Sequence, residues 1–425
     1  MRRINSAGTV RMAVAAAVVV AAGVGGVASS SAKQARAAGS TVDFYSSLPT
    51  VGSSSAQTIP AQNGIKLALK LAGNKAGSYT IKYTYLNDAT ASAGQWTAAQ
   101  TSADARKAAT DPNAVYYMGE FNSGASEVSM PILNRAGIAQ DSPANTYVGL
   151  TASLKGVTAK GEPGIYFPTG HRTYTRIVPL DTIQGAADLD ALKGAGCKRL
   201  AIFDDTQAYG AGLAAVLKAT AHMYGIKVVS VQANATVQSD YSSVAQAFAS
   251  AGAQCVELSA TTASVGGTAF VAAIHTALPK ATVLGPDGMC TSAWVTDEKV
   301  LCTVATLDMK AYPGGKKFLA EYKKAYGVSN PDPYSIYGYE SAELGIHALS
   351  QVKAGLSGKA LRAAVVKALF ATKNLSSVLG TFSINSAGDT TLTSYGLYKL
   401  TPNNTKADTL TFDKTLHPMA YLHAS

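Results

Sequence analysis

The chain has 425 residues, enough for about two or three domains of roughly 150 residues each. Hydrophobic residues make up 47% of the chain and charged residues 15%, a composition that excludes intrinsic disorder. Five of the basic residues behind the formal net charge of +10 lie in the first 37 residues, which contain no acid. Without them the net charge is +5 and no basic run is longer than a pair, which excludes nucleic acid as a partner.

The amino terminus, residues 1–37, is typical of a cleaved export signal. A basic start precedes an apolar run from Met12 to Val27, and small residues then lead to Ala35-Arg36-Ala37, which predicts cleavage before Ala38. The alternative is a membrane anchor, but sixteen residues are short for a bilayer core that needs about 20. We therefore expect an exported, extracytoplasmic protein. The stretch has no cysteine that could carry a lipid, and the export route stays open.

Four cysteines, Cys197, Cys255, Cys290 and Cys302, are an even number in a chain that we expect to be exported. This favours disulfides over free thiols. No CxxC occurs and the six histidines form no HxxxH or similar pair, so we expect no metal site.

From Thr41 onward, β-rich runs alternate with amphipathic helical stretches in two series. Each helix connects two strands, which predicts parallel strands joined by right-handed crossovers. The first series has strands Val42–Ser46, Thr80–Leu86, Ala114–Gly119 and Ile138–Asp141, with helices Ala61–Ala72, Trp96–Ala109 and Ala125–Ala136. The second has strands Arg199–Asp204, Lys227–Gln232, Cys255–Ser259 and Thr282–Leu284, with helices Gly210–Tyr224, Tyr241–Ala251 and Val265–Ala277.

The rest of the chain should complete both series. A Pro/Gly-rich stretch, Gly149 to Thr173, is interpreted as the linker between them. After Cys302 the expected elements are helices Gly315–Tyr326, Tyr334–Val352 and Leu361–Phe370, then strands Val378–Ile384 and Tyr395–Leu400. This tail is too short for a third domain, so the chain should cross between two lobes more than once.

The predicted fold class is α/β, with two Rossmann-like lobes of parallel sheets flanked by helices, joined by a hinge of several crossovers. We expect an N-terminal lobe of residues 41–175 plus 309–382 and a C-terminal lobe of residues 176–308 plus 383–425. Because ligands collect beyond the carboxyl ends of parallel strands, a ligand cleft should lie between the lobes.

Catalytic signatures are mostly absent from the sequence. It contains no GxSxG, GxxxxGK[ST] or HExxH motif. Residues Gly210–Ala215 match GxGxxA, but five residues separate this match from the preceding strand, and the next strand ends without an acid that could hold a ribose. We therefore expect neither nucleotide binding nor any other cofactor.

Two loops stand out as candidate ligand contacts. Gly119–Ser126 leads from a strand end into a helix start, where free N–H groups and serine hydroxyls suit a carboxylate. An equally good interpretation is that Ser123 or Ser126 only caps the helix. Asp141–Tyr147 should lie beside it on the same sheet edge, where a simple solvated turn is also possible.

These loops are also where the chain resembles a known family. Met118–Ser126, with the sequence MGEFNSGAS, followed by Gly137–Gln140 and Ser142–Thr146, is similar to the type I periplasmic binding proteins of the leucine/isoleucine/valine-binding group. The resemblance implies an extracytoplasmic solute receptor of an ABC importer, whose two lobes close on an amino acid or similar small molecule. It continues through four further blocks in order, Arg176–Gly185, Asp204–Gly212, Leu284–Gly288 and Tyr337–Ala342.

For the N-terminal lobe, the resemblance implies specific ligand contacts. Ser123 corresponds to the family's carboxylate-binding serine, with Ser126 nearby. Ala144 and Thr146 correspond to the backbone and hydroxyl contacts of the following loop. Tyr334 is a further candidate for the lining of the cleft.

For the C-terminal lobe, Tyr209 resembles the tyrosine of the family's YGxG turn. Asp287 resembles the acid of the G-P-[ED]-G turn, which pairs with an α-ammonium group. The first loop departs from the family because it lacks an aromatic residue, so Gln57 or a serine takes that place. The loop Leu258–Thr262 lacks the family's tyrosine, and together these departures predict a more polar pocket.

The expected disulfides are Cys197–Cys255 and Cys290–Cys302. Cys197 and Cys255 lie at the entries of the first and third strands of the second series, which are neighbours in a 2-1-3 strand order, so their Cα atoms could lie within about 7 Å. The second disulfide would close a short loop next to Asp287.

We therefore expect a monomeric solute-binding protein that closes on an amino acid or a similar compound and delivers it to a membrane ABC permease. One alternative is a receptor that senses a ligand such as an amide without transport. Another is an enzyme that uses the same cleft, but no histidine stands in a motif-defined relation to Ser123.

Overall fold

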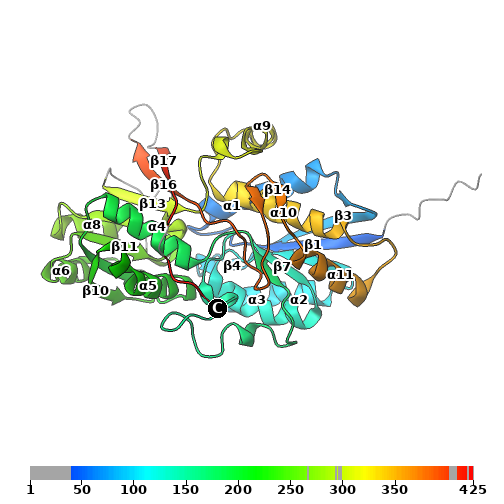
Figure 1. Cartoon of the computed structure of the whole chain (residues 1–425), viewed down its shortest axis with the longest axis horizontal. Helices are drawn as coiled ribbons and strands as arrows, with labels where there is room; N and C mark the ends of the chain where they lie inside the picture. The colour runs from blue at the N-terminus through cyan, green and yellow to red at the C-terminus, as the bar shows by residue number, and fades with distance from the viewer. Residues whose placement is uncertain are drawn as a thin grey trace, which may run out of the picture. The chain divides into compact units, whose positions relative to one another are not determined.

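The computed structural model describes residues 40–265, 268–291, 294, 299–401, 409–418 and 421–424. The predicted export signal lies outside the described residues. The chain forms two separate, mainly parallel β-sheets with helices against their faces, which confirms the predicted fold class (Figure 1). No helix in the described part of the chain is long and apolar enough to cross a membrane.

The first sheet has six strands in the order β2-β3-β1-β6-β7-β8, and all neighbours are parallel except β2 and β3. Its strand β6 has the sequence AVYYM and is buried along its whole length, as expected where helices cover both faces. The strands are β1 (Thr41–Ser47), β2 (Lys75–Ala76), β3 (Tyr79–Leu86), β6 (Ala114–Met118), β7 (Ala139–Ser142) and β8 (Tyr174–Arg176). The connecting elements are α1 (Ser55–Leu71), the short pair β4 (Ala89–Thr90) and β5 (Gln95–Trp96), α2 (Ala98–Thr110) and α3 (Ser123–Ala136).

The second sheet has the order β10-β9-β11-β12-β13-β16-β17, in which the last two strands run antiparallel to their neighbours. The strands are β9 (Arg199–Asp204), β10 (Lys227–Ala233), β11 (Cys255–Ser259), β12 (Thr282–Gly285), β13 (Val300–Val304), β16 (Tyr395–Thr401) and β17 (Thr409–Leu416). The helices are α4 (Asp181–Gly194), α5 (Ala208–Thr220), α6 (Ser242–Ser250), α7 (Thr262–Val265) and α8 (Thr268–Ala277).

The chain passes between the two sheets three times, in agreement with the predicted multiple crossings. It leaves the first sheet after β8, returns after β13 and leaves again before β16. The returning segment packs on the first sheet's side, because α10 packs along α1 and α11 packs on β6 and β7. It comprises α9 (Gly315–Tyr326), α10 (Tyr334–Ser350), α11 (Gly358–Phe370), β14 (Leu375–Ser377) and β15 (Gly380–Phe382). The boundaries of the two lobes stay a prediction.

The structure corrects one expectation and adds one helix that was not predicted. The stretch 149–173 does not join the two series, because it connects β7 to β8, which are neighbours in the first sheet. Helix α4 has no counterpart among the predicted elements. Eleven of its fourteen residues are buried, and the buried ones include polar residues. Its sequence therefore does not show the separate apolar and polar faces by which an amphipathic helix is recognised.

Both disulfides occur in the predicted pairing. Cys197 is bonded to Cys255 with a Cα–Cα distance of 5.9 Å, and β9 and β11, the strands that these residues precede and begin, are neighbours as expected. Cys290 is bonded to Cys302 on β13 with a Cα–Cα distance of 5.3 Å. No free cysteine is found.

The Cys197–Cys255 disulfide should contribute more to stability than the Cys290–Cys302 disulfide. It spans 58 residues rather than 12, and closing a longer loop removes more entropy from the unfolded chain. Replacing Cys197 and Cys255 with alanine should lower the free energy of unfolding by about 4 kcal/mol, against about 3 kcal/mol for Cys290 and Cys302. Urea unfolding of the two double variants measures both values. A larger loss for Cys290 and Cys302, or four free thiols in unreduced protein, would contradict this prediction.

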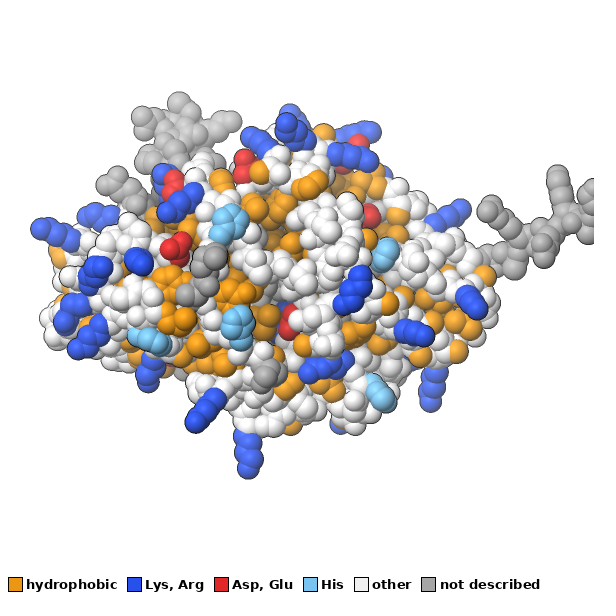
Figure 2. Space-filling model, in the orientation of Figure 1, with side chains coloured by type: hydrophobic (Ala, Val, Ile, Leu, Met, Phe, Trp, Pro, Cys, Tyr) orange, Lys and Arg blue, Asp and Glu red, His pale blue; other side chains and the backbone are white. Residues whose placement is uncertain are grey.

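Basic side chains are scattered over the face shown in Figure 2, and they do not gather in one patch there. This distribution fits the absence of an electrostatic footprint for nucleic acid in the sequence.

Candidate ligand-binding site

Six of the eight predicted ligand-binding residues line one cavity between the two sheets. Four residues that the sequence analysis did not single out as contacts complete its lining: Phe121, Asn122, Thr261 and Gly288. The cavity has a volume of about 20 Å³, room for about one water molecule. The predicted residues in the lining are Ser123, Ala144, Thr146, Tyr209, Asp287 and Tyr334.

The first wall of the cavity consists of the two loops that follow β6 and β7. Asn145 joins them, because its amide nitrogen donates to the carbonyl of Phe121 at 2.8 Å while its side-chain oxygen accepts from the hydroxyls of Ser126 and Tyr174. Ser142 adds a bond to the carbonyl of Glu120 at 2.7 Å. Ser126 therefore connects the two loops and does not line the cavity, and its predicted role as a ligand contact stays a prediction.

Arg176 supports the backbone of the loop that follows β7. Its guanidinium is buried and donates to the carbonyls of Asn145 and Tyr147 at 3.1 and 2.7 Å. It is paired with Asp389 at 2.8 Å. The backbone of Ala144–Tyr147 is thus positioned by a charged network before any ligand arrives.

Polar groups of the first wall face the cavity at the start of α3. Ser123 is the first residue of this helix, and its N-cap residue Asn122 makes no capping side-chain bond. The side-chain oxygens of Asn122 and Thr146 are buried without a hydrogen-bond partner in the described structure. A helix N-terminus with a serine hydroxyl and an unpaired threonine hydroxyl can hold a carboxylate.

Gly124 is required for the close packing of the wall at this point. An added β-carbon would lie 2.9 Å from the ring of Trp96, so no larger residue fits beneath that ring. The indole nitrogen of Trp96 donates to Gln207, at the start of α5 beside the second sheet, at 3.1 Å. Trp96 therefore covers the start of α3 and contacts the opposite wall.

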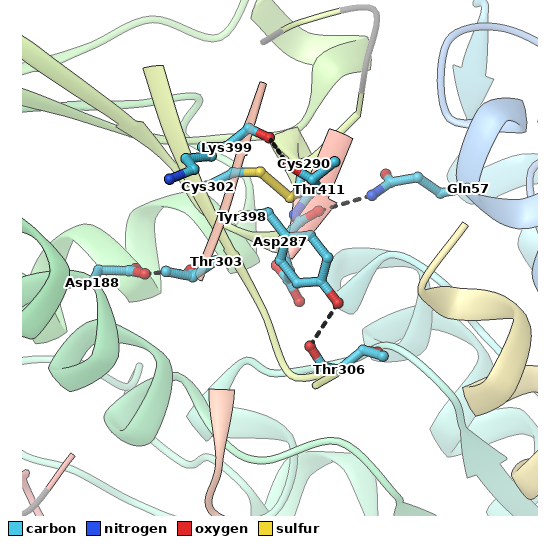
Figure 3. The surroundings of a disulfide bond; sticks show 11 residues. Gln57, Asp188, Asp287, Cys290, Cys302, Thr303, Thr306, Tyr398, Lys399 and Thr411 are labelled. Atoms are coloured by element: carbon cyan, nitrogen blue, oxygen red, sulfur yellow. Dashed lines mark hydrogen bonds between the residues drawn. A yellow bond between two sulfur atoms is a disulfide. The ribbon is translucent and has the colours of Figure 1, made fainter. Parts of the chain in front are cut away.

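The second wall carries the carboxylate of Asp287, which is 3% exposed. One of its oxygens accepts from the hydroxyl of Tyr209 at 2.5 Å and from the backbone of Gly288 at 2.7 Å. The other accepts from the hydroxyl of Tyr334 at 2.6 Å. Asp287 begins a short 3₁₀ turn, Asp287–Met289, and the Cys290–Cys302 disulfide ties the end of this turn to β13 (Figure 3).

The two walls are in direct contact in this conformation. Gln57 on α1 points across to Asp287 and donates to its backbone carbonyl at 2.8 Å (Figure 3). Tyr334 on α10 reaches the same residue from the first sheet's side. Gln57 thus connects the two walls beside the cavity without lining it, and its role as a ligand contact stays a prediction. A ligand as large as an amino acid must separate these contacts in order to enter.

Burial raises the pKa of Asp287, and the hydroxyls of Tyr209 and Tyr334 oppose this shift. Burial, with the charge of Asp287, raises the pKa of both tyrosines well above the usual value, so they remain donors. The pKa of Asp181 is raised to about 8 by burial and by the charge of Asp287.

Further buried acids lie behind Asp287. Asp188 accepts a hydrogen bond from the hydroxyl of Thr303, and Glu257 accepts one from the hydroxyl of Ser259. Burial raises the pKa of both, and the charge of Asp188 adds to the shift of Glu257. In the described residues no group of three or more acidic, histidine or cysteine side chains is arranged to hold a metal ion. A cationic ligand group placed against this wall would lower the pKa of these carboxyls and favour their charged forms.

The sequence signal for the additional lining residues was weak. Asn122 lies inside a predicted loop, and Thr261 follows the carboxyl end of β11, where ligand contacts are expected. Phe121 and Gly288 are neighbours of residues that were predicted. Only the positions of these four residues in the chain, and no feature of their side chains, indicated that they belong to the site.

Comparisons with known proteins find a family model, a relative in sequence and solved structures of similar fold. A model described as periplasmic binding protein matches residues 46–405. Leu/Ile/Val-binding protein homolog 3 from Brucella melitensis is 24% identical over 291 residues, which cover 67% of this chain and 72% of that protein.

Solved structures are similar over most of the chain. The leucine binding protein LivK from Thermotoga maritima has a TM-score of 0.72 at 21% identity and covers 89% of this chain and 99% of its own. A solute binding protein of an ABC transporter from Rhodopseudomonas palustris, in complex with p-hydroxybenzoic acid, has a TM-score of 0.70 at 16% identity, with coverages of 89% and 97%. LivJ from Streptococcus pneumoniae, in complex with isoleucine, has a TM-score of 0.67 at 17% identity, with coverages of 88% and 99%.

Proposed function

This chain belongs to the periplasmic binding protein family, and from that premise we propose that it captures an amino acid or a similar small molecule outside the cytoplasm for import by an ABC permease. The observation that carries the proposal is that two binding groups of opposite preference face each other across one cavity. The start of α3 with Ser123 and Thr146 offers donors to a carboxylate, and Asp287 on the other wall offers a charge to an ammonium group.

Ligand capture would proceed by closure of the two walls. In the open state, Gln57 and Tyr334 are separated from Asp287, and the ligand binds first to one wall. Closure then adds contacts from the other wall, so the ligand stabilises the closed state by its differential affinity. We further propose that residues 1–37 direct export and that the mature protein acts as a monomer.

The named relatives support a carboxylate-bearing ligand. LivJ is in complex with isoleucine, and the Rhodopseudomonas palustris protein is in complex with p-hydroxybenzoic acid, which has a carboxylate but no amine. An organic acid without an amine is therefore a second candidate ligand class. It is favoured by the fact that both oxygens of Asp287 already accept hydrogen bonds from tyrosine hydroxyls.

A thermal-shift screen tests the proposed function. We expect amino acids with a polar side chain to raise the melting temperature, because a ligand that binds only the folded protein stabilises it by mass action. Amides, organic acids without an amine and sugars form the other arms of the screen. A shift from organic acids alone would select the second candidate, and a shift from sugars alone would overturn both. Product formed from any compound would instead indicate an enzyme.

Transport and sensing without transport can be separated by uptake of the ligand selected in the screen. Cells that lack this protein should lose uptake of that ligand if it serves a permease. Unchanged uptake would favour the receptor that only senses.

A further inference from the structure

A second cavity, distinct from the one at Asp287, lies among α9, α10 and β14. These three elements are labelled in the upper part of Figure 1. The cavity has a volume of about 560 Å³, within the range of about 300–1,000 Å³ that is usual for small-molecule sites. Helix α9 forms one side of it and is tied to the neighbouring helices by Phe318, which packs on Tyr339 at a centroid distance of 5.3 Å.

The side chain of Glu340 is the unusual feature of this cavity. It belongs to the lining and is only 1% exposed, yet neither of its carboxylate oxygens has a hydrogen-bond partner in the described structure. The Ser377 hydroxyl and the Val378 N–H lie near enough to lower its pKa, but outside bonding geometry. Burying a carboxyl whose oxygens accept no hydrogen bond costs free energy, so the position of Glu340 requires an explanation.

The surroundings of Glu340 add negative charge. Glu343 and Glu321 line the same cavity. The pKa of Glu340 is raised to about 8, chiefly by burial and then by the charge of Glu343. Lys317 is the cation of the lining and lowers the pKa of Glu343, whereas burial lowers the pKa of His347 and favours its neutral form. The carboxyl of Glu340 is left without a bonded cation.

Apart from Ser376 and Ser377, the remaining lining is mainly apolar and aromatic. Phe318, Tyr339 and Ile346 from α9 and α10 form it together with Leu375 and Val378. Such a surface can cover an alkyl chain, and the two rings can also stabilise a cation. The described acids do not form a metal cluster, so the chemistry selects an organic cation.

We propose that this cavity is a second ligand site, which binds a primary ammonium group on an apolar body, with the ammonium against Glu340. An ammonium group has three N–H donors. These can bond to the two oxygens of Glu340 that lack a partner. The alkyl part lies against Phe318 and Ile346. This site is independent of the amino-acid site proposed at Asp287.

Calorimetric titration of the mature chain at pH 8 with n-hexylamine tests the proposal, with 1-hexanol and hexanoate as matched probes. We expect hexylamine to bind at least about tenfold more tightly than either, since only it supplies a charged donor. Glu340→Gln should weaken hexylamine binding about tenfold or more. Asp88→Asn is the matched control, because Asp88 is equally buried with both oxygens unpaired in the described structure but lies between β3 and β4, outside this cavity.

Equal binding of hexanol and hexylamine, or equal binding to wild type and Glu340→Gln, would overturn the proposal. Loss of hexylamine binding in Asp287→Asn would also overturn it, because the amine would then occupy the first cavity. If Glu340→Gln fails to fold, Ile346→Trp provides the second test. It fills the cavity from its rim and should abolish hexylamine binding, and retained binding would contradict the site.

Discussion

Replacing Asp287 with asparagine should weaken binding of an amino-acid ligand by at least about tenfold. The carboxylate is fixed between the hydroxyls of Tyr209 and Tyr334 and the backbone of Gly288, so it can form a charge-assisted bond without reorganising. Removing one partner of a buried charge pair costs about 2–5 kcal/mol, which is about thirtyfold in affinity at the lower end of that range and more than about a thousandfold at the upper end. Calorimetric titration with the best amino acid from the screen measures the loss.

Asparagine is the informative substitution because it keeps the shape of the side chain. Burial raises the pKa of Asp287, so a neutral residue should leave the melting temperature of the empty protein unchanged or slightly higher. Asp204→Asn is a matched control at the end of β9, since Asp204 is also buried but does not line the cavity. Equal affinities of wild type and Asp287→Asn would refute the ammonium contact and favour an organic acid.

The free energy of unfolding should fall as the pH rises from about 4 to about 8. Burial raises the pKa of several carboxyls, so the folded protein keeps protons that the unfolded chain releases near pH 4. Their stabilisation is fully present below that pH and is lost as the pH rises through the folded pKa values. The carboxyls are Asp88, Asp141 and Asp332, with a pKa of about 7, and Asp181 and Glu340, with a pKa of about 8.

Urea unfolding at pH 5 and pH 8 measures this loss, which should be at least about 2 kcal/mol because one pKa unit corresponds to about 1.4 kcal/mol. Asp181→Asn should reduce the difference, since both oxygens of Asp181 are buried without a hydrogen-bond partner in the described structure. Asp190→Asn, a partly exposed residue on the same helix, should leave it unchanged. Stability that is constant or rises between pH 5 and pH 8 would show that these carboxyls are charged in the folded protein.

Elements with a clear hydrophobic period and clear end signals could be predicted from the amino-acid sequence alone. The boundaries of β9 and α9 agree with the predicted ones, because both segments carry a local pattern of apolar residues. The disulfide pairing followed from the strand order of a parallel α/β unit. The resemblance of Leu284–Gly288 to the family's G-P-[ED]-G turn placed Asp287 at the candidate site, and Asp287 lies in the lining of the cavity.

Features that depend on contacts between distant segments could not be predicted from the local sequence. Helix α4 is buried on nearly all sides, so no polar face indicates it in the sequence. Ser126 turns to Asn145, nineteen residues away, and Gln57 reaches the carbonyl of Asp287, 230 residues away. The neutral or charged state of Asp181 and Glu340 likewise depends on what packs around them. A local pattern states which side chains are apolar or polar, but their partners and their desolvation are set by the packing of the whole chain.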